Sequence, residues 1–218
     1  VMAHGQQITR LDHGEWNLKK INKETQKKII DNLKKELKNY DFIIFSDYNK
    51  GFFSEDLAQE IIHLANLNNI HTIVDSKPSN INYFKNCTII RPNEKEAELI
   101  TGIKYSNGPE TLLKMGKRLS QITNSKYTII TCGRDGVFSY DRIKNKGHLV
   151  PTKAQNIVDV AGAGDTFAAA FALSMSSGLD IYDSSKIANY AAGNVVEKSG
   201  VDVTTLSELR ERIKKDNI

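Results

Sequence analysis

Cysteine is scarce in this sequence. Only Cys87 and Cys132 occur, far apart in the chain and each inside an apolar run. This spacing argues against a disulfide framework and a zinc site, and the five histidines show no metal-ligand spacing either. We therefore expect both thiols to be buried and reduced.

Long apolar runs and a leader pattern are also missing. No stretch approaches the roughly 18 apolar residues needed to cross a bilayer. The first residues lack the basic-then-apolar pattern of a signal peptide. We therefore expect a cytoplasmic protein without a membrane partner.

A strong excess of one charge is absent as well. The net charge is +4, and acidic residues are interspersed among the lysines, as in KKIIDNLKKELK at 27–38. We therefore expect no nucleic-acid partner, and a basic nucleic-acid binder is only a third alternative. Hydrophobic residues make up 39% of the 218 residues, which favours one folded domain over residues 1–218.

Short β-branched runs alternate with amphipathic stretches, a pattern typical of an α/β fold with a mostly parallel central sheet. The runs are FIIFS (42–46), HTIVD (71–75), CTIIRP (87–92) and YTIITCG (127–133). Helices are expected at 25–37, 56–66 after an N-cap at Ser54, 95–100 and 110–122, then at 162–176, 184–197 and 206–213. Between the two sets, VFSYD and HLVP around RIKNKG predict an antiparallel hairpin.

The front of the chain differs from this pattern. GQQITRLD at 5–12 already reads as a strand in mid-sheet, and no βα unit precedes it. We therefore expect that something is missing before Val1.

The segment DVAGAGD at 159–165 carries the strongest chemical signal. The strand NIVDV is predicted to run into a glycine turn and then into a helix that begins near Ala163, so free N–H groups meet at a point that attracts anions. Gly162 and Gly164 admit a phosphate close to the main chain, and Asp165 could accept a proton there. A tight turn with a helix cap is the equally weighted alternative for this motif alone.

This motif resembles the signature Asp-Thr-x-Gly-Ala-Gly-Asp of the ribokinase-like carbohydrate kinases, with Val160 in place of the threonine. The resemblance implies that Asp165 is the catalytic base and that Ala161, Gly162, Ala163 and Gly164 form the anion hole. It also implies a three-layer α/β/α fold, here without the family's N-terminal strands and lid.

NEKE at 93–96 resembles the family's Asn-x-x-Glu. The resemblance implies that Glu96 helps to organise Mg²⁺ and that Asn93 lies near the phosphates. Without the resemblance, a capping start to the following helix is the favoured alternative.

TCGRDG at 131–136 resembles the family's nucleotide segment, which implies that Thr131, Gly133 and Gly136 lie on the ATP side. Asn189 matches the position beside the adenine. The alternatives are an ordinary turn into a hairpin and an unremarkable polar residue on a helix.

The segments QQITRLD, SDYNKG and VDSKP look like those of the heptose 7-phosphate kinase branch. They follow neighbouring strands, where open parallel sheets bind ligands, which places Asp47, Lys50, Asp75 and Lys77 on the cleft side. The lysines could hold phosphates, and the aspartates could bind sugar hydroxyls or orient metal-bound water. Loop salt bridges, such as one between Asp47 and Lys50, are the alternative.

Together these resemblances imply an ATP- and Mg²⁺-dependent kinase. It would phosphorylate D-glycero-β-D-manno-heptose 7-phosphate to the 1,7-bisphosphate, a step toward the lipopolysaccharide core. K⁺ near Asp159 and a homodimer belong to the same expectation. A noncatalytic nucleotide- or sugar-phosphate-binding protein of the same fold is the second alternative, and a kinase for another sugar is also open.

Overall fold

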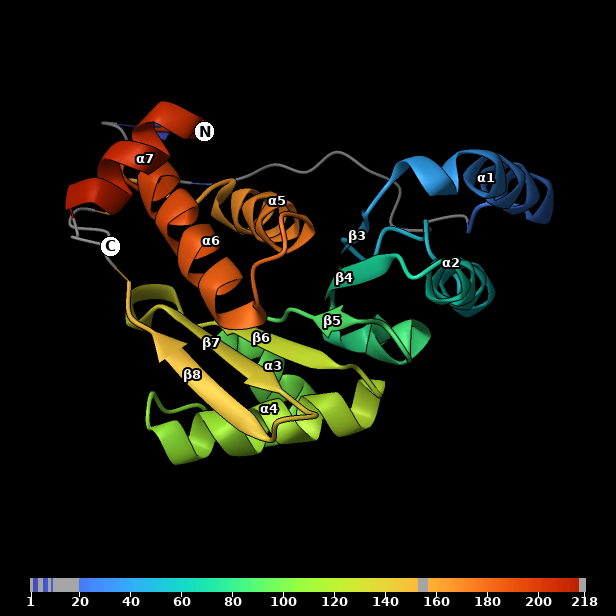
Figure 1. Ribbon diagram of the computed structural model, residues 1–218, viewed down its shortest axis with the longest axis horizontal. Coiled ribbons are helices and arrows are strands. Elements are labelled where there is room, and N and C mark those ends of the chain that lie inside the picture. Colours follow the sequence, from blue (N-terminus) through green and yellow to red (C-terminus); the bar gives the residue numbers. More distant parts are fainter. Residues whose placement is uncertain (1, 4–5, 8, 10–19, 153–156, 216–218) are drawn as a thin grey trace.

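The computed structural model describes residues 2–3, 6–7, 9, 20–152 and 157–215 (Figure 1). Its strands are β1 (Met2–Ala3), β2 (Gln6–Gln7), β3 (Phe42–Asp47), β4 (His71–Ser76), β5 (Ile89–Ile90), β6 (Tyr127–Thr131), β7 (Val137–Asp141) and β8 (Lys146–Val150). Its helices are α1 (Lys23–Glu36), α2 (Glu55–Leu67), α3 (Glu94–Thr101), α4 (Pro109–Thr123), α5 (Ala163–Ser176), α6 (Ile181–Val196) and α7 (Leu206–Lys215). Short 3-10 helices lie at Leu37–Asn39, Pro78–Phe84 and Gly133–Asp135.

Six strands form one sheet in the order β3-β4-β5-β6-β7-β8. The first four run parallel, with Ile73 paired to Ile89 and Ile89 paired to Tyr127. β7 and β8 are antiparallel and form the predicted hairpin. The carboxyl ends of β3 to β6 therefore meet at one edge of the sheet, where the predicted site residues are expected.

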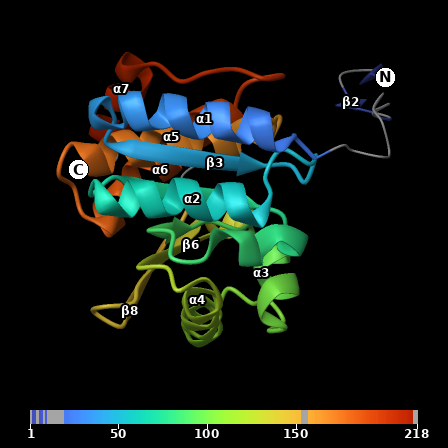
Figure 2. The ribbon, with the colours of Figure 1, turned by 90° about the vertical axis from the view of Figure 1, so that its right-hand side faces the viewer.

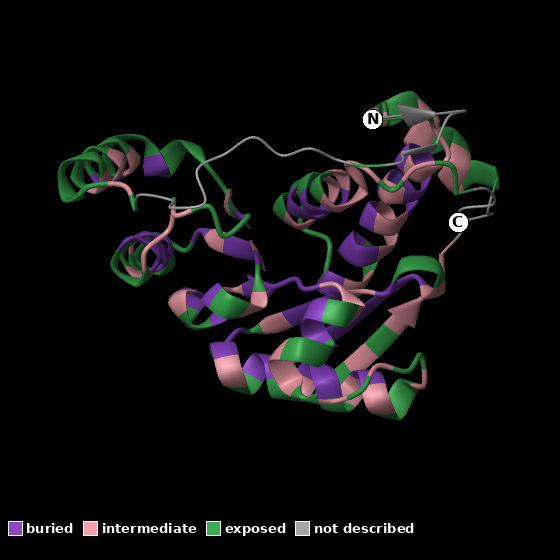
Figure 3. Ribbon diagram, turned by 180° about the vertical axis from the view of Figure 1, so that it is seen from behind, coloured by how far each residue is buried: buried purple, intermediate pink, exposed green. Residues whose placement is uncertain are grey.

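Helices cover both faces of this sheet (Figure 2), as the α/β/α prediction requires. α2, α3 and α4 pack on one face, and α5 and α6 pack on the other. α1 packs against α2, and α7 packs against α6. Figure 3 shows that burial concentrates toward the sheet, and none of the described residues of α7 is buried.

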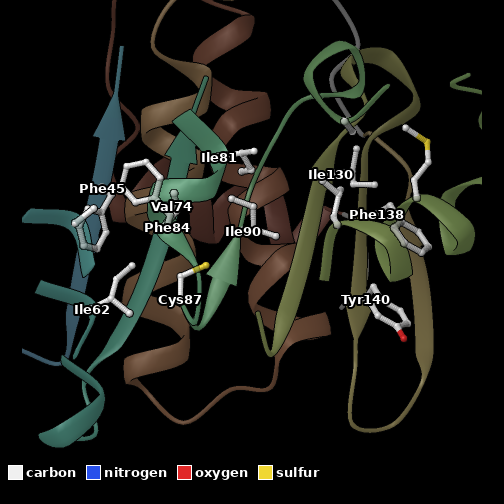
Figure 4. Close-up of a cluster of buried hydrophobic side chains, with 14 of the residues drawn as sticks. Phe45, Ile62, Val74, Ile81, Phe84, Cys87, Ile90, Ile130, Phe138 and Tyr140 are labelled. Carbon is white, nitrogen blue, oxygen red and sulfur yellow. The ribbon is translucent and has the colours of Figure 1, made fainter. Parts of the chain in front are cut away.

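Strand side chains alternate between two cores because successive residues point to opposite faces of a sheet. Val74 and Ile90 lie in the larger core, which they share with residues of α2 and α4 (Figure 4). Their neighbours Ile73 and Ile89 lie in the second core with Phe171 of α5. Both faces of the central strands are therefore buried, as the continuous β-branched runs indicate.

The helices begin within about one turn of their predicted positions. The Ser54 prediction is confirmed, because its hydroxyl accepts a hydrogen bond from the N–H of Leu57 at 3.2 Å. α6 begins three residues earlier than predicted. Asp180 precedes it and accepts hydrogen bonds from the N–H groups of Tyr182 and Asp183, so this residue is the N-cap.

Two predicted strands are wrong in the described residues. In NIVDV, residues 157–160 form no strand, because the N–H groups of Val158 and Asp159 donate to the carbonyl of Val196 at the end of α6. In GQQITRLD, only Gln6–Gln7 is a strand, and it pairs antiparallel with β1 instead of joining the six-stranded sheet. Asn156 and most of the other residues of GQQITRLD lie outside the described residues.

Candidate active site

A cavity of about 560 Å³ lies between the end of β6, the beginning of β7 and helices α5 and α6. Much of its wall is apolar, with contributions from Val137, Ile157 and Phe167. Seven residues predicted from the sequence line it: Asn93, Thr131, Gly133, Gly136, Ala163, Gly164 and Asn189. Seven others do not: Asp47, Lys50, Asp75, Lys77, Glu96, Gly162 and Asp165. The structure therefore brings together four separate sequence segments around one cavity.

The glycine turn enters α5 in a conformation that favours glycine. Gly162 has φ +79° and ψ −9°, and a Cβ atom there would lie 3.6 Å from Val201, an ordinary contact. The positive φ, and not a lack of space, is therefore the reason for glycine at this position. The N–H groups of Gly164 and Asp165 have no acceptor among the described residues. Together with the helix dipole, these two groups can bind an anion.

Asp165 lies in the first turn of α5 and is exposed. Its carboxylate forms no hydrogen bond or ion pair with any described residue. A negative charge in this turn is favoured by the helix dipole. The carboxylate is therefore available to a bound molecule next to the glycine turn.

Gly136 lies at the end of the segment TCGRDG, against the hairpin. Its φ is +105°, and a Cβ atom there would lie 2.0 Å from the carbonyl oxygen of Val150. Asn189 of α6 donates a hydrogen bond to the carbonyl of Pro151 at 3.0 Å. Backbone at the end of β8 therefore lies next to both the TCGRDG turn and α6.

NEKE forms a capping box at the start of α3, as its residues alone predict. Asn93 Oδ1 accepts from the N–H of Glu96 at 2.9 Å, and Glu96 Oε2 accepts from the N–H of Asn93 at 3.1 Å. Glu96 is buried, and its Oε1 accepts from Lys77 Nζ at 2.8 Å. This hydrogen bond raises the pKa of Lys77. Both oxygens of Glu96 therefore have partners within the chain.

Asp75 pairs with Arg91, a residue that the sequence reasoning missed. Arg91 Nη2 donates to Asp75 Oδ2, and the arginine side chain is buried. Burial raises the pKa of the Asp75 carboxyl, and the charge of Arg91 opposes that rise. The available signal was the arginine in the apolar run CTIIRP, directly after the buried strand β5, where a charge needs a partner.

Asp47 orders the loops at the ends of β3 and β4. It is buried, and its carboxylate accepts from the N–H of Asn49 at 2.9 Å, Ser76 Oγ at 3.1 Å and Asn80 Nδ2 at 2.9 Å. Within the described part of the chain, no ion pair joins Asp47 to Lys50, which is exposed. Of the four predicted substrate-side residues, only Lys50 therefore has a side chain without an internal partner among the described residues.

Residues 16–208 match the family model for the pfkB family carbohydrate kinases. The chain belongs to the pfkB family of carbohydrate kinases. The bifunctional protein HldE of Aliarcobacter butzleri is 36% identical to this pfkB-family chain over 211 residues. The match covers 97% of this chain and 43% of HldE, so the chain spans less than half of that relative.

Two solved structures of kinases have a similar fold at low sequence identity. Phosphofructokinase-2 from Escherichia coli in complex with potassium has a TM-score of 0.77 and 14% identity, covering 91% of this chain and 64% of that chain. Arabidopsis thaliana ribokinase complexed with ribose and ATP has a TM-score of 0.72 and 18% identity, covering 89% and 60%. These similarities confirm the predicted ribokinase-like fold. Within the described residues, no helix is both long and apolar enough to cross a membrane.

Proposed function

We propose that this chain binds ATP in the 560 Å³ cavity and carries the phosphoryl-transfer centre of a sugar-phosphate kinase. The supporting observation is that NEKE, TCGRDG, the glycine turn and α6 all line the same cavity. An apolar wall suits a purine base, and the adjoining glycine turn suits phosphates. A single kinase domain over residues 1–218 is part of this proposal.

In the proposed reaction, the γ-phosphoryl group of ATP lies at the beginning of α5. The N–H groups of Gly164 and Asp165 donate to its oxygens and stabilise the charge that develops during transfer. The exposed Asp165 carboxylate accepts the proton of the sugar hydroxyl, whose oxygen attacks phosphorus as ADP leaves. Asn93, Thr131, Gly133, Gly136 and Asn189 form the rest of the nucleotide site.

Mg²⁺ bound with ATP supplies positive charge that neutralises the phosphates. In the described ranges, no group of three or more His, Cys, Asp or Glu side chains can hold a metal. That fits an ion held mainly by nucleotide phosphates and water, which is usual for Mg²⁺. We propose Glu96 as the carboxylate that orients those waters.

The proposed acceptor is D-glycero-β-D-manno-heptose 7-phosphate, converted to the 1,7-bisphosphate for synthesis of the lipopolysaccharide core. The segments SDYNKG and VDSKP and the identity with HldE support this choice. Lys50 is the residue we assign to the substrate phosphate, because it is exposed and its ammonium group has no internal partner among the described residues. Asp47, Asp75 and Lys77 are proposed to shape the same side of the site.

Three further parts of the proposal come from the resemblance. K⁺ would bind to backbone carbonyls near Asp159. The structure of phosphofructokinase-2 in complex with potassium motivates this part of the proposal. A homodimer is the proposed assembly. The cytoplasm is the proposed location because it supplies ATP and keeps free thiols, such as the buried Cys87 and Cys132, reduced.

Calorimetric titration and a product assay test the proposal together. We expect the chain to bind ATP and to transfer ³²P from γ-labelled ATP to heptose 7-phosphate, and not to fructose 6-phosphate or ribose used as matched acceptors. Transfer to one of the other acceptors would keep the kinase and remove the heptose assignment. Absence of nucleotide binding would overturn the proposed function.

A noncatalytic nucleotide- or sugar-phosphate-binding protein is the second candidate. One observation favours it: Asp47, Asp75 and Lys77 all have partners within the chain. ATP binding in the titration without labelled product under any acceptor would support this candidate over the kinase.

A further inference from the structure

Arg91 is a buried cation whose hydrogen-bonding capacity is largely unused. Its residue exposure is 4%, and its Nε atom is buried without a hydrogen-bond partner. Its guanidinium lies over the ring of Phe167, with 5.9 Å between Cζ and the ring centroid. Among the described residues, Asp75 is the only hydrogen-bond partner of this guanidinium. A buried arginine normally satisfies more of its five N–H groups than this.

The guanidinium of Arg91 lies next to the glycine turn. A Cβ atom on Gly164 would lie 3.5 Å from both Nη1 and Nη2 of Arg91. Gly164 and Phe167 both line the 560 Å³ cavity. The positive charge of Arg91 therefore lies beside the turn whose N–H groups face the proposed phosphoryl position.

Arg91 and Asp75 are not an isolated ion pair, because other charged residues also act on Asp75. Asp75 also lies within electrostatic range of Lys77, Glu96 and Asp165. The Lys77 ammonium is already hydrogen-bonded to Glu96. Removing a cation from water is costly unless nearby partners satisfy its charge and its N–H groups. Because Asp75 also interacts with other charges, it does not fully neutralise Arg91. The remaining N–H groups of Arg91 can bind a second anion.

We propose that Arg91 is a phosphate-binding residue of the transfer centre, and that Asp75 acts through it as a positioning residue instead of binding the sugar. This inference rests on the proposed nucleotide site. In it, the guanidinium and the N–H groups of Gly164 and Asp165 together bind the terminal phosphate of a polyphosphate chain. Such charge-assisted hydrogen bonds are about twice as strong as neutral ones.

The competing explanation is that Arg91 only joins β4 to α5 through Asp75 and Phe167. Both explanations predict that a single substitution lowers stability, because it leaves one buried charge without its partner. They differ in which ligands are affected. A phosphate-binding arginine discriminates ATP from AMP, whereas a purely structural arginine affects both nucleotides alike.

The test compares Arg91→Met/Asp75→Asn, which removes both charges together, with Arg91→Lys and the wild-type chain. The matched control is Arg118→Met, which removes an exposed arginine of α4 on the other side of the sheet. Binding of ATP, AMP and inorganic tripolyphosphate is measured by calorimetry, with circular dichroism and thermal unfolding to verify folding. The double variant keeps the test informative if a single variant fails to fold.

We expect the double variant to lose about tenfold or more in affinity for ATP and tripolyphosphate, with AMP affinity changed less than about twofold. Arg91→Lys should fall between, because lysine keeps the charge without the fork of donors. Equal losses for ATP and AMP, or no change in either, would overturn the inference while leaving the proposed nucleotide site intact. Arg91-dependent tripolyphosphate binding without ATP binding would instead support the anion site and overturn the nucleotide proposal. Failure of the wild-type chain to bind any of the three would overturn both.

Discussion

The two sides of the candidate site are built differently. On the proposed nucleotide side, residues from four segments line one cavity, and the N–H groups of Gly164 and Asp165 have no acceptor among the described residues. On the substrate side, Asp47 and Asp75 are held by hydrogen bonds and ion pairs within the chain. The first region has backbone N–H groups that are free to bind a ligand. In the second region, the polar side chains hold the surrounding loops in place. A carboxylate at a strand end is therefore not by itself a ligand-binding group.

The largest expected effect is on the nucleotide side. Asp165→Asn should lower kcat of the kinase by about 10²–10⁴, because the amide cannot accept the proton of the acceptor hydroxyl. ATP affinity should change less than about twofold, since the carboxylate is not proposed to bind the nucleotide. Steady-state kinetics and calorimetric titration measure both quantities.

The matched control for that variant is Asp183→Asn, an exposed acid in the first turn of α6. It should leave kcat unchanged. Turnover by Asp165→Asn at the wild-type rate would show that Asp165 is not the base. The proposed nucleotide side would then have no more evidence of a catalytic group than the substrate side.

The next effect tests the wall of the cavity. Gly136→Ala should destabilise the fold by about 3 kcal/mol, because its Cβ atom would overlap the carbonyl of Val150 and its φ is positive. Gly102→Ala is the matched comparison, since Gly102 has φ +70° but no atom within 4 Å of the added Cβ. That variant should cost only about 1 kcal/mol. Urea unfolding measures both, and equal losses would show that the contact with β8 does not limit this position.

A smaller effect tests the substrate side. Asp47→Ala should lower stability by about 2 kcal/mol, because the donors of Asn49, Ser76 and Asn80 lose their shared acceptor. Asp31→Ala, on the exposed face of α1, should stay within about 0.5 kcal/mol of wild type. A rise in KM for the sugar phosphate without any loss of stability would instead make Asp47 a substrate ligand.

The smallest effect concerns pH. Lys77 has a pKa above its ordinary value of 10.5, chiefly because of its hydrogen bond to Glu96. A raised pKa means that the folded state holds the proton more tightly, so this contribution to stability is complete below about pH 10.5 and disappears as pH rises through the folded pKa. Between about pH 9 and 12, the thermal unfolding temperature should therefore fall more steeply with rising pH for wild type than for Lys77→Met. Lys50→Met is the control and should follow the wild-type curve; parallel curves for all three would contradict the assignment.

Much of the fold could be predicted because its signals are local. β-branched runs gave β3, β4 and β6, and the helices followed from apolar spacing and from caps such as Ser54. NIVDV misled because its composition favours a strand, whereas its hydrogen bonds go to a helix end distant in sequence. Propensity reports local preference and cannot show where a backbone donor finds its acceptor.

In the candidate site, too, local features could be predicted from the sequence and long-range pairings could not. Part of the cavity is lined by two glycine-containing segments, TCGRDG and the glycine turn, whose backbone turns the sequence indicates, as at Gly136. Arg91 and the partners of Asp47 could not be predicted, because their pairing depends on which strand ends become neighbours. The roles assigned to individual site residues are still predictions.

The single carbonyl of Val196 accepts hydrogen bonds from the N–H groups of Val158 and Asp159, and Val196 also lines the cavity. The end of α6 and the segment that leads into the glycine turn are therefore held together by hydrogen bonds to one backbone carbonyl. A ligand that fixes α6 would reduce the entropy lost in ordering the turn, and by thermodynamic reciprocity an anion on the turn would favour binding in the cavity. We therefore expect amide exchange at Val158 and Asp159 to slow when a nucleotide binds at the proposed site, because both N–H groups donate to the same helix end.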